Sequence, residues 1–320
     1  MSMDESKVHT EEGAHAPKRP TPGPSDHMKI PVIAVLAGAA APRERTFKNK
    51  IIGFVSMHSV LIRVMIFPVL AAPYVVAGGL IDAKFLIFFF ATLLGGIFVQ
   101  VFNDVWDVER DRKKWPMRPL PTGLLSRRVM AVYMLILGGL TLVIAGVVFN
   151  LAFLVGVLIL FALNVIYVTY ARDHVGVLTG LIPIATMTPV AWLAVAPGTI
   201  LTALPWLLTM IHVTIAGIGQ VLNEVRIPQK ALFVTFTPSM NKVLTISSAV
   251  AFFLISTYTF LYAHWAWPFM VVTGAFTVWA LAQARYWGKP EQIKKLTTAF
   301  RAFTQWNAVF WTTMAVVAWI

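Results

Sequence analysis

The chain has 320 residues, of which 58% are hydrophobic and only 12% are charged, and its mean hydropathy is +0.74. Soluble domains carry about 25% charged residues, because a folded surface must face water, so this composition excludes an ordinary soluble globular protein. The chain has no cysteine, which excludes a disulfide framework, an iron–sulfur protein and a thiol nucleophile. Its net charge of +12 is typical either of nucleic-acid binding or of the cytoplasmic loops of a membrane protein.

The first part of the chain differs in composition from the rest. Residues 1–49 are rich in proline, serine and acidic residues near their start, and they contain no apolar core of the kind found in a signal peptide. We expect them to form a largely disordered cytoplasmic tail. Residues 50–320 are expected to form a single membrane domain.

Long apolar runs fill that second part. A helix needs about 20 mostly apolar residues to cross a bilayer, and three of the charge-free runs are twice that length, each interrupted near its middle at Asn150, at 196–198 or at 263–264. We therefore predict an all-α polytopic membrane protein with nine transmembrane helices. Their expected positions are 60–80, 85–103, 128–147, 151–170, 175–195, 201–223, 243–262, 265–284 and 302–320.

The basic residues are distributed very unevenly between the two sides of this predicted topology. Of the 26 lysines and arginines, 25 would lie on the same side as the N-terminus, and only Lys84 would lie on the other. Such an excess marks the cytoplasmic side. The positive charge is thus explained by orientation in the lipid bilayer, and no nucleic-acid partner is expected.

Four of the 14 acidic residues fall in one stretch that closes the second predicted span, Asn103-Asp104-Val-Trp-Asp107-Val-Glu109-Arg-Asp111. At about 100° per residue, Asp104, Asp107 and Asp111 share one helix face with Asn103 beside them, whereas Glu109 points away. With no other neutraliser evident, clustered carboxylates favour a bound cation, and Mg²⁺ prefers carboxylate and phosphate oxygens. A simpler interpretation is a helix end whose acids pair with nearby arginines.

A basic segment follows the acids directly. It holds several cations, including Lys114, and then Arg118 in the sequence Arg118-Pro119-Leu120-Pro121-Thr122-Gly123. The prolines and glycine predict a rigid turn. A fixed arginine beside a metal site suits a pyrophosphate, whose oxygens are bridged by cations and gripped by a guanidinium fork. We therefore predict a diphosphate site that includes Arg118 and Lys114.

The motif Asn103-Asp104-x-x-Asp107-x-x-x-Asp111, with the Arg118–Gly123 segment after it, resembles the first signature of the UbiA superfamily of intramembrane prenyltransferases. In that family the signature also follows the second of nine transmembrane helices. The resemblance covers residues 50–320 and implies a helical bundle around a central cavity that opens laterally to lipid. It also implies Mg²⁺-dependent transfer of a prenyl group from a prenyl diphosphate to a lipophilic acceptor of the aromatic or quinone type.

The family carries a second acidic motif after the sixth span, and here the equivalent stretch is Gln220-Val-Leu-Asn223-Glu224-Val-Arg226-Ile-Pro228-Gln-Lys230. It keeps one carboxylate where the family usually has two or three aspartates, and Pro228 interrupts it. The resemblance implies that Asn223 and Glu224 are metal ligands and that Lys230 contacts the diphosphate. Glu224 is also a candidate base, and a plain polar helix end is the alternative.

Further candidates rest on the same resemblance. Tyr167, Tyr170 and Arg172 end the fourth span, where family members often carry a tyrosine and a basic residue that face the diphosphate. Arg63 lies near the start of the first span, where the family has an arginine that helps to hold a substrate. The alternatives are interfacial tyrosines and an arginine that snorkels to the membrane surface.

Two other functions remain open at this point. A UbiA-type terpene cyclase would ionise the same prenyl diphosphate and capture the cation with the substrate's own double bonds, and the altered second motif keeps this alternative open. A secondary transporter is a more remote alternative, because transporter sites usually lie near the bilayer midplane. The acidic cluster lies instead at a predicted membrane edge, which favours an enzyme.

Overall fold

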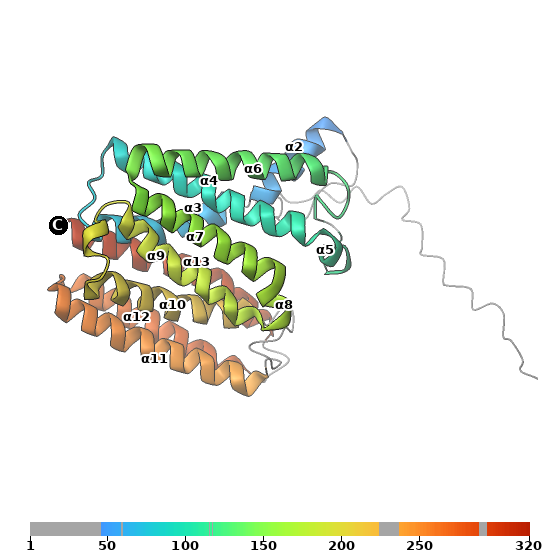
Figure 1. The fold of residues 1–320 in the computed structure, drawn as a ribbon. Helices are drawn as coiled ribbons and strands as arrows, with labels where there is room; N and C mark the ends of the chain where they lie inside the picture. Colours follow the sequence, from blue (N-terminus) through green and yellow to red (C-terminus); the bar gives the residue numbers. More distant parts are fainter. Residues whose placement is uncertain (1–45, 59, 115, 117, 224–236, 288–292) are drawn as a thin grey trace, which may run out of the picture.

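The protein is described by a computed structural model covering residues 46–58, 60–114, 116, 118–223, 237–287 and 293–320, and within these ranges it is entirely helical, without strands. The α-helices are α2 Phe47–His58, α3 Val60–Val76, α4 Ala83–Trp106, α5 Val108–Lys114, α6 Arg127–Ile144, α7 Leu151–Ile166, α8 Arg172–His174, α9 Leu181–Leu193, α10 Ala203–Asn223, α11 Pro238–Ala263, α12 Pro268–Gln283 and α13 Ile293–Trp319. Figure 1 shows them as one elongated bundle with roughly parallel and antiparallel axes. The predicted all-α class is confirmed.

Each of the nine predicted spans corresponds to a long helix among the described residues. Five helical segments are long and apolar enough to cross a membrane by length and composition: 83–106, 127–149, 151–174, 203–222 and 238–263. The chain is therefore an integral membrane protein, and the count of nine crossings stays a prediction.

The interruptions expected from the sequence occur where helices end. Asn150 begins α7, because its side-chain oxygen accepts a hydrogen bond from the Phe153 N–H at 2.8 Å while its amide donates to the Leu193 carbonyl at 2.9 Å. His264 ends α11 in the left-handed conformation, with φ of 53°. Both positions turn the chain by satisfying or redirecting backbone groups that a helix end leaves free.

The long helices form a ring in chain order. Each of α3, α4, α6, α7, α9, α10, α11, α12 and α13 contacts the next, and α13 packs against α3 to close the ring. Additional contacts cross the ring between α3 and α9 and between α10 and α13. The closing pair lies at the two ends of the sequence, so the ring is a property of the whole domain.

The core is apolar, and so is much of the outer surface. Phe252, Phe276, Phe310 and Trp311 are fully buried between the later helices. Large aliphatic residues such as Leu135 and others on α6, α7 and α11 are exposed on the outside of the bundle. Exposed apolar surface of this extent is stable only against lipid or another apolar partner, which agrees with the membrane assignment.

The two ends of the bundle carry different residues. At one end lie α5, α8 and the beginnings of α11 and α13; at the other lie the C-terminus and the connections 77–82, 145–150, 194–202 and 264–267. In those four connections Asp82 is the one charged side chain, with Lys84 just beyond it. We call the first the acidic end, because it holds the Asp104–Asp111 cluster, and the second the apolar end.

Candidate active site

The acidic cluster lies at the junction of α4 and α5. The sequence predicted one continuous helical face, but α4 stops at Trp106 and Asp107 caps it with φ of −84° and ψ of 7°. Helical spacing is nevertheless kept, since the Asp107 N–H donates to the Asn103 carbonyl at 2.9 Å and the Asp111 N–H donates to the Asp107 carbonyl at 2.7 Å. The predicted grouping therefore survives the interruption.

Burial separates the three aspartates from the glutamate, as the helical-face argument requires. Only 5% of Asp111 is exposed, and the Asp104 and Asp107 side chains are 16% and 12% exposed. The Glu109 side chain is 69% exposed and pairs with Arg112 at 2.8 Å. The carboxylates of the three aspartates thus point into the bundle, and the Glu109 carboxylate points outward.

Arg118 joins two of these carboxylates. Its Nη1 lies 2.7 Å from Asp111 Oδ2 and 3.5 Å from Asp104 Oδ1. The turn that carries it is closed by the Thr122 hydroxyl, which donates to the Arg118 carbonyl at 3.0 Å, and by Gly123, whose φ of 70° favours glycine. The predicted rigid turn is present and places its arginine on the acids.

Arg172 holds the third carboxylate from the opposite side. It reaches from α8 to Asp107 in a bidentate pair at 2.7 and 2.8 Å, and its Nη1 also donates to Asn103 Oδ1 at 3.0 Å. The remaining donors go to the Val168 carbonyl at 3.2 Å and to Asp173 at 3.5 Å. All five guanidinium N–H groups thus have acceptors, and the Arg172 side chain is only 6% exposed.

These arginines correct one premise of the sequence analysis, namely that the aspartates lack any neutraliser other than a metal ion. Arg118 and Arg172 pair with all three of them. In the described part of the chain, no group of three His, Asp or Glu side chains is arranged to hold a metal ion. The acids are therefore compensated by arginines in this conformation, as the simpler interpretation expected.

The two tyrosines of the fourth span lie differently. They belong to a π-helical turn, Tyr167–Ala171, that leads into α8. The Tyr167 ring lies 5.9 Å from the Arg172 guanidinium carbon, beside the cluster. Tyr170 is 57% exposed and stacks on His174 at 4.3 Å. Of the two tyrosines that the resemblance placed at the site, Tyr167 therefore adjoins the acids and Tyr170 does not.

Several predicted site residues are not placed. Glu224 and Lys230 of the second motif lie outside the described residues. Asn223, Arg63 and Lys114 belong to described helices, but their side chains lie outside the described part. Their assignments stay predictions.

Sequence reasoning missed one member of the cluster, Asp173. It accepts from Arg172 at 3.5 Å and from Arg110 at 3.4 Å, and Arg110 also lies 3.9 Å from Asp107. These contacts tie α5 to α8. An acid directly after the arginine that ends the fourth span was the available signal, but its partner is 63 residues away.

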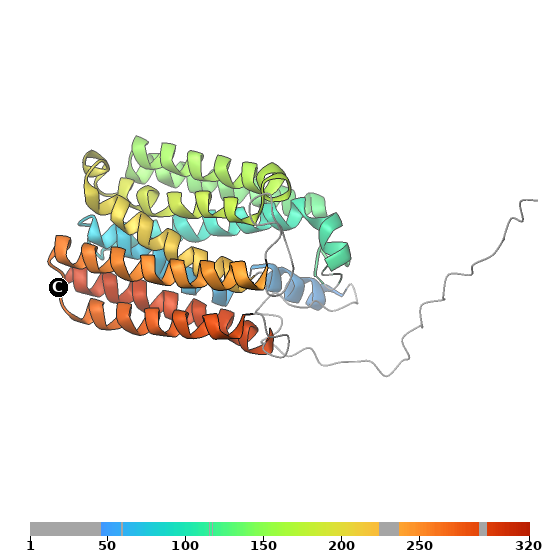
Figure 2. The same ribbon diagram turned by 90° about the horizontal axis from the view of Figure 1, so that it is seen from below.

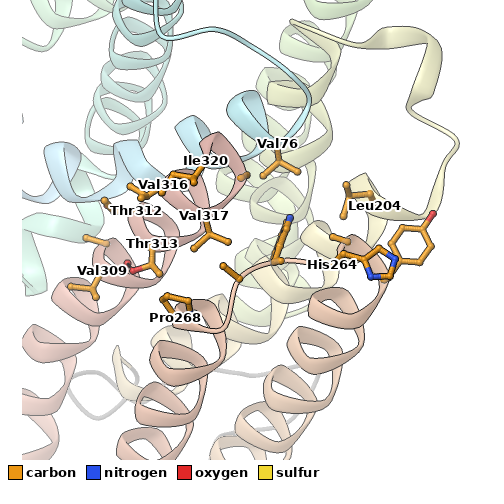
Figure 3. Close-up of a pocket in the computed structure, with 16 residues that line it drawn as sticks. Val76, Leu204, His264, Pro268, Val309, Thr312, Thr313, Val316, Val317 and Ile320 are labelled. Carbon is orange, nitrogen blue, oxygen red and sulfur yellow. Dashed lines mark hydrogen bonds between the residues drawn. The ribbon is translucent and has the colours of Figure 1, made fainter.

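A large pocket lies at the apolar end, away from these charges. It has a volume of about 1040 Å³ and is formed by the α11–α12 turn, the last turns of α13 and the adjoining ends of α3 and α10. Figure 3 shows Val316, Val317, Leu204 and Val76 around it, with His264 at its edge. Its lining is mostly aliphatic, so it offers no group suited to a diphosphate.

Comparison with known proteins identifies the fold. The structure is similar to that of a UbiA homolog from Archaeoglobus fulgidus bound to DMAPP and Mg²⁺, with a TM-score of 0.55 and 16% identity over 81% of this chain and 99% of that chain. The same homolog bound to GPP and Mg²⁺ gives 0.57 and 17%, over 82% and 100%. A digeranylgeranylglyceryl phosphate synthase structure gives 0.57 and 13%, over 84% and 99%.

At these identities the similarity is one of fold. A search of curated proteins found no match. The model of the UbiA prenyltransferase family, however, matches residues 65–314, a region that contains the acidic cluster, Arg118 and Arg172. The chain therefore belongs to the UbiA prenyltransferase family.

Proposed function

We propose that this protein is a Mg²⁺-dependent intramembrane prenyltransferase that ionises a prenyl diphosphate and transfers the prenyl group to a lipophilic acceptor. The observation that carries the proposal is the convergence of three shielded carboxylates and the Asn103 amide at one helix end, with two arginines among them. Ionisable side chains near a bilayer are costly and often mark a functional site, and oxygen ligands beside arginines suit a metal-bound diphosphate.

The oxygen atoms of these side chains are of the type that a magnesium ion binds, although among the described residues arginines, not a metal-binding arrangement, compensate the acids in this conformation. Asn103, Asp104, Asp107 and Asp111 offer only oxygen ligands, which Mg²⁺ prefers together with substrate phosphates. A cationic nitrogen of Arg118 already lies between Asp104 and Asp111, so this position accommodates positive charge. The chemistry that Mg²⁺ supplies at such a site is neutralisation of the diphosphate oxygens and stabilisation of the leaving group.

The two arginines are suited to different tasks. The Arg118 side chain is 37% exposed, so it can turn from the carboxylates to the phosphate oxygens when substrate and metal arrive. Arg172 is nearly buried and has every N–H engaged. We expect it to remain in place and to keep Asn103 and Asp107 aimed at the site.

In the reaction, the bond between the allylic carbon and the diphosphate oxygen breaks, and the diphosphate leaves with the electron pair. Arg118 stabilises the negative charge that grows on the leaving group. The allylic cation is then attacked by an electron-rich atom of the acceptor. An aromatic acceptor must afterwards lose a proton, and Glu224 of the second motif is the proposed base or, by preference, a further metal ligand.

The donor and the reaction type can be tested together. Purified protein in lipid nanodiscs is incubated with Mg²⁺ and labelled dimethylallyl, geranyl, farnesyl or geranylgeranyl diphosphate, with and without a lipid extract that supplies acceptors. We expect diphosphate release and a labelled lipophilic product that depends on the extract. A hydrocarbon or terpene alcohol formed without extract would indicate a cyclase instead, and no diphosphate release from any donor would contradict the proposal.

The role of Glu224 has its own test. As a metal ligand, Glu224→Gln should raise the Mg²⁺ concentration needed for half-maximal rate, because one negative charge leaves the site. As a base, it should slow product formation without changing the Mg²⁺ requirement. A titration and a rate that both match wild type would remove Glu224 from the site.

We further propose that the acidic end faces the cytoplasm, on the basis of the lysine and arginine distribution. The absence of native cysteine makes a labelling test simple. Ser126→Cys lies at the acidic end and Thr202→Cys at the apolar end, and both positions are exposed. A membrane-impermeant maleimide added to intact cells should label only Thr202→Cys, and the reverse pattern would invert the orientation.

A further inference from the structure

A second polar site lies at the acidic end, between the end of α12 and the beginning of α13. It is a groove of about 360 Å³, open to the outside, and it belongs to helices that carry none of the residues of the acidic cluster. Its lining residues are Trp279, Gln283, Tyr286, Lys295, Thr298, Ala299 and Ala302. The lining therefore combines a basic, hydrogen-bonding end with an apolar wall.

The basic end is organised around one tyrosine ring. The Arg285 guanidinium carbon lies 4.8 Å from the centre of the Tyr286 ring, and the Arg285 Nη2 donates to the tyrosine oxygen at 2.7 Å. The Lys295 ammonium lies 5.4 Å from the same ring centre. Tyrosine faces attract cations, so Tyr286 in the groove wall is contacted by one cation from each side of the α12–α13 connection, and Lys295 itself lines the groove.

These two cations carry no counter-charge within the part of the chain that the structure describes. The ion pairs found there involve Arg110, Arg112, Arg118 and Arg172, and none involves Arg285 or Lys295. Each cation attracts an anion that approaches the Tyr286 end of the groove. The groove mouth is thus suited to a group with one or two negative charges.

The apolar wall continues from this mouth along the bundle. Trp279 stacks on Phe276 at 5.6 Å and lies near Trp306 at 6.4 Å, while Ala299 and Ala302 leave space beside it. Val278, which precedes Trp279 in α12, is 69% exposed on the outer surface. Aromatic residues and adjacent cations at a helix end are typical of the membrane–water interface. A ligand in this groove would contact positive charge at the Tyr286 end and apolar side chains along the rest of its length.

We propose that this groove binds an anionic phospholipid, with its phosphate at the cationic end marked by Lys295, Tyr286 and Arg285 and one acyl chain along Trp279. Basic pockets between membrane helices on the cytoplasmic side are suited to anionic headgroups, and the apolar wall gives a reason for a lipid rather than a free phosphate. The inference concerns residues outside the proposed active site and does not depend on the prenyl-transfer proposal.

The test measures lipid binding directly, by native mass spectrometry of the delipidated protein in detergent after addition of phosphatidylglycerol, phosphatidylcholine or inorganic phosphate. We expect a phosphatidylglycerol adduct that is at least about five times as abundant as the phosphatidylcholine adduct. The double variant Arg285→Gln/Lys295→Gln should abolish that preference. The matched control Arg127→Gln/Arg128→Gln removes two exposed cations at the start of α6, at the same end of the bundle, and should keep it.

Three outcomes would overturn the proposal. Equal binding of the two lipids would show that the groove does not select for headgroup charge. Competition by inorganic phosphate at equal concentration would indicate a site for free phosphate. Equal loss of the phosphatidylglycerol adduct in both double variants would indicate nonspecific attraction by surface charge. Ala302→Trp keeps both cations and fills the space beside Trp279 where the acyl chain is proposed to lie. It should also reduce the phosphatidylglycerol adduct, and retention of the adduct would contradict the acyl-chain placement, even if the charge variant proved too unstable to measure.

Discussion

The acidic and apolar ends of the bundle are built from the same helices but stabilised in different ways. At the acidic end, shielded carboxylates are compensated by arginines from a turn and from α8. Arg118 joins Asp104 to Asp111, and Arg172 joins Asp107 to the Asn103 amide. At the apolar end, helices are ended by Asn150, by the left-handed His264 and by backbone hydrogen bonds. Among the described residues, the clustered carboxylates and paired arginines lie at the first end.

The two ends also differ in how many charged side chains they hold. Charged side chains are expensive away from water unless they are paired, and the protein confines them to an end where partners converge. The pocket at the apolar end, although large, is lined mainly by aliphatic residues. The proposal of a reaction site at the acidic end therefore depends on the chemical character of the side chains and not on the size of the pocket.

The largest expected effect comes from removing metal ions. If the acidic end acts through Mg²⁺, EDTA should abolish release of diphosphate from a prenyl diphosphate, and excess Mg²⁺ or Mn²⁺ should restore it. The assay is diphosphate release by purified protein before and after chelation. Full turnover in a metal-free preparation would remove the metal from the mechanism and leave the arginines alone to hold the substrate.

Asp107→Asn should reduce the rate at least about 10²-fold, on the scale of losing one electrostatic stabiliser of a transition state. Its control is Glu109→Gln at the same helix junction, which removes an exposed carboxylate paired with Arg112 and should change the rate less than twofold. Steady-state kinetics on both variants measure the contrast. A comparable loss of rate in both variants would mean that the inward position of Asp107 is not the reason for its importance.

Arg172→Gln should have an intermediate effect, of about tenfold or more on the rate, because it leaves Asp107 without its bidentate partner. As a positioning residue, it should also change the Mg²⁺ concentration required for half-maximal rate. Arg172→Lys, which keeps the charge but not the fork, should recover only part of the loss. An unchanged Mg²⁺ requirement together with a raised KM for the prenyl diphosphate would instead indicate direct contact with the substrate.

The smallest effect is expected at the apolar end. Val316→Phe narrows the pocket of Figure 3 and should change the rate less than twofold with a short donor such as dimethylallyl diphosphate. The informative measurement is the ratio of rates with long and short prenyl donors. A selective loss with the long donors would show that this end receives the tail of the prenyl chain, and the two ends would then share one substrate.

The sequence by itself determined the helical segments, their approximate ends and the face on which the aspartates lie. These features depend on hydropathy and on the repeat of a helix, which act over a few residues. The outward position of Glu109 follows from the helical repeat, and the turn at Gly123 follows from the prolines and glycine of the local sequence.

Tertiary structure decided which groups meet. Arg172 lies 69 residues from Asn103, and no local pattern states that the end of the fourth span closes on the end of the second. The same holds for Asp173 with Arg110, for the outward rotation of Tyr170 through the π-helical turn, and for the packing of α13 against α3. Pairing across the ring is set by how the described helices share one core, because burial of a guanidinium is tolerated only where the fold brings carboxylates to it.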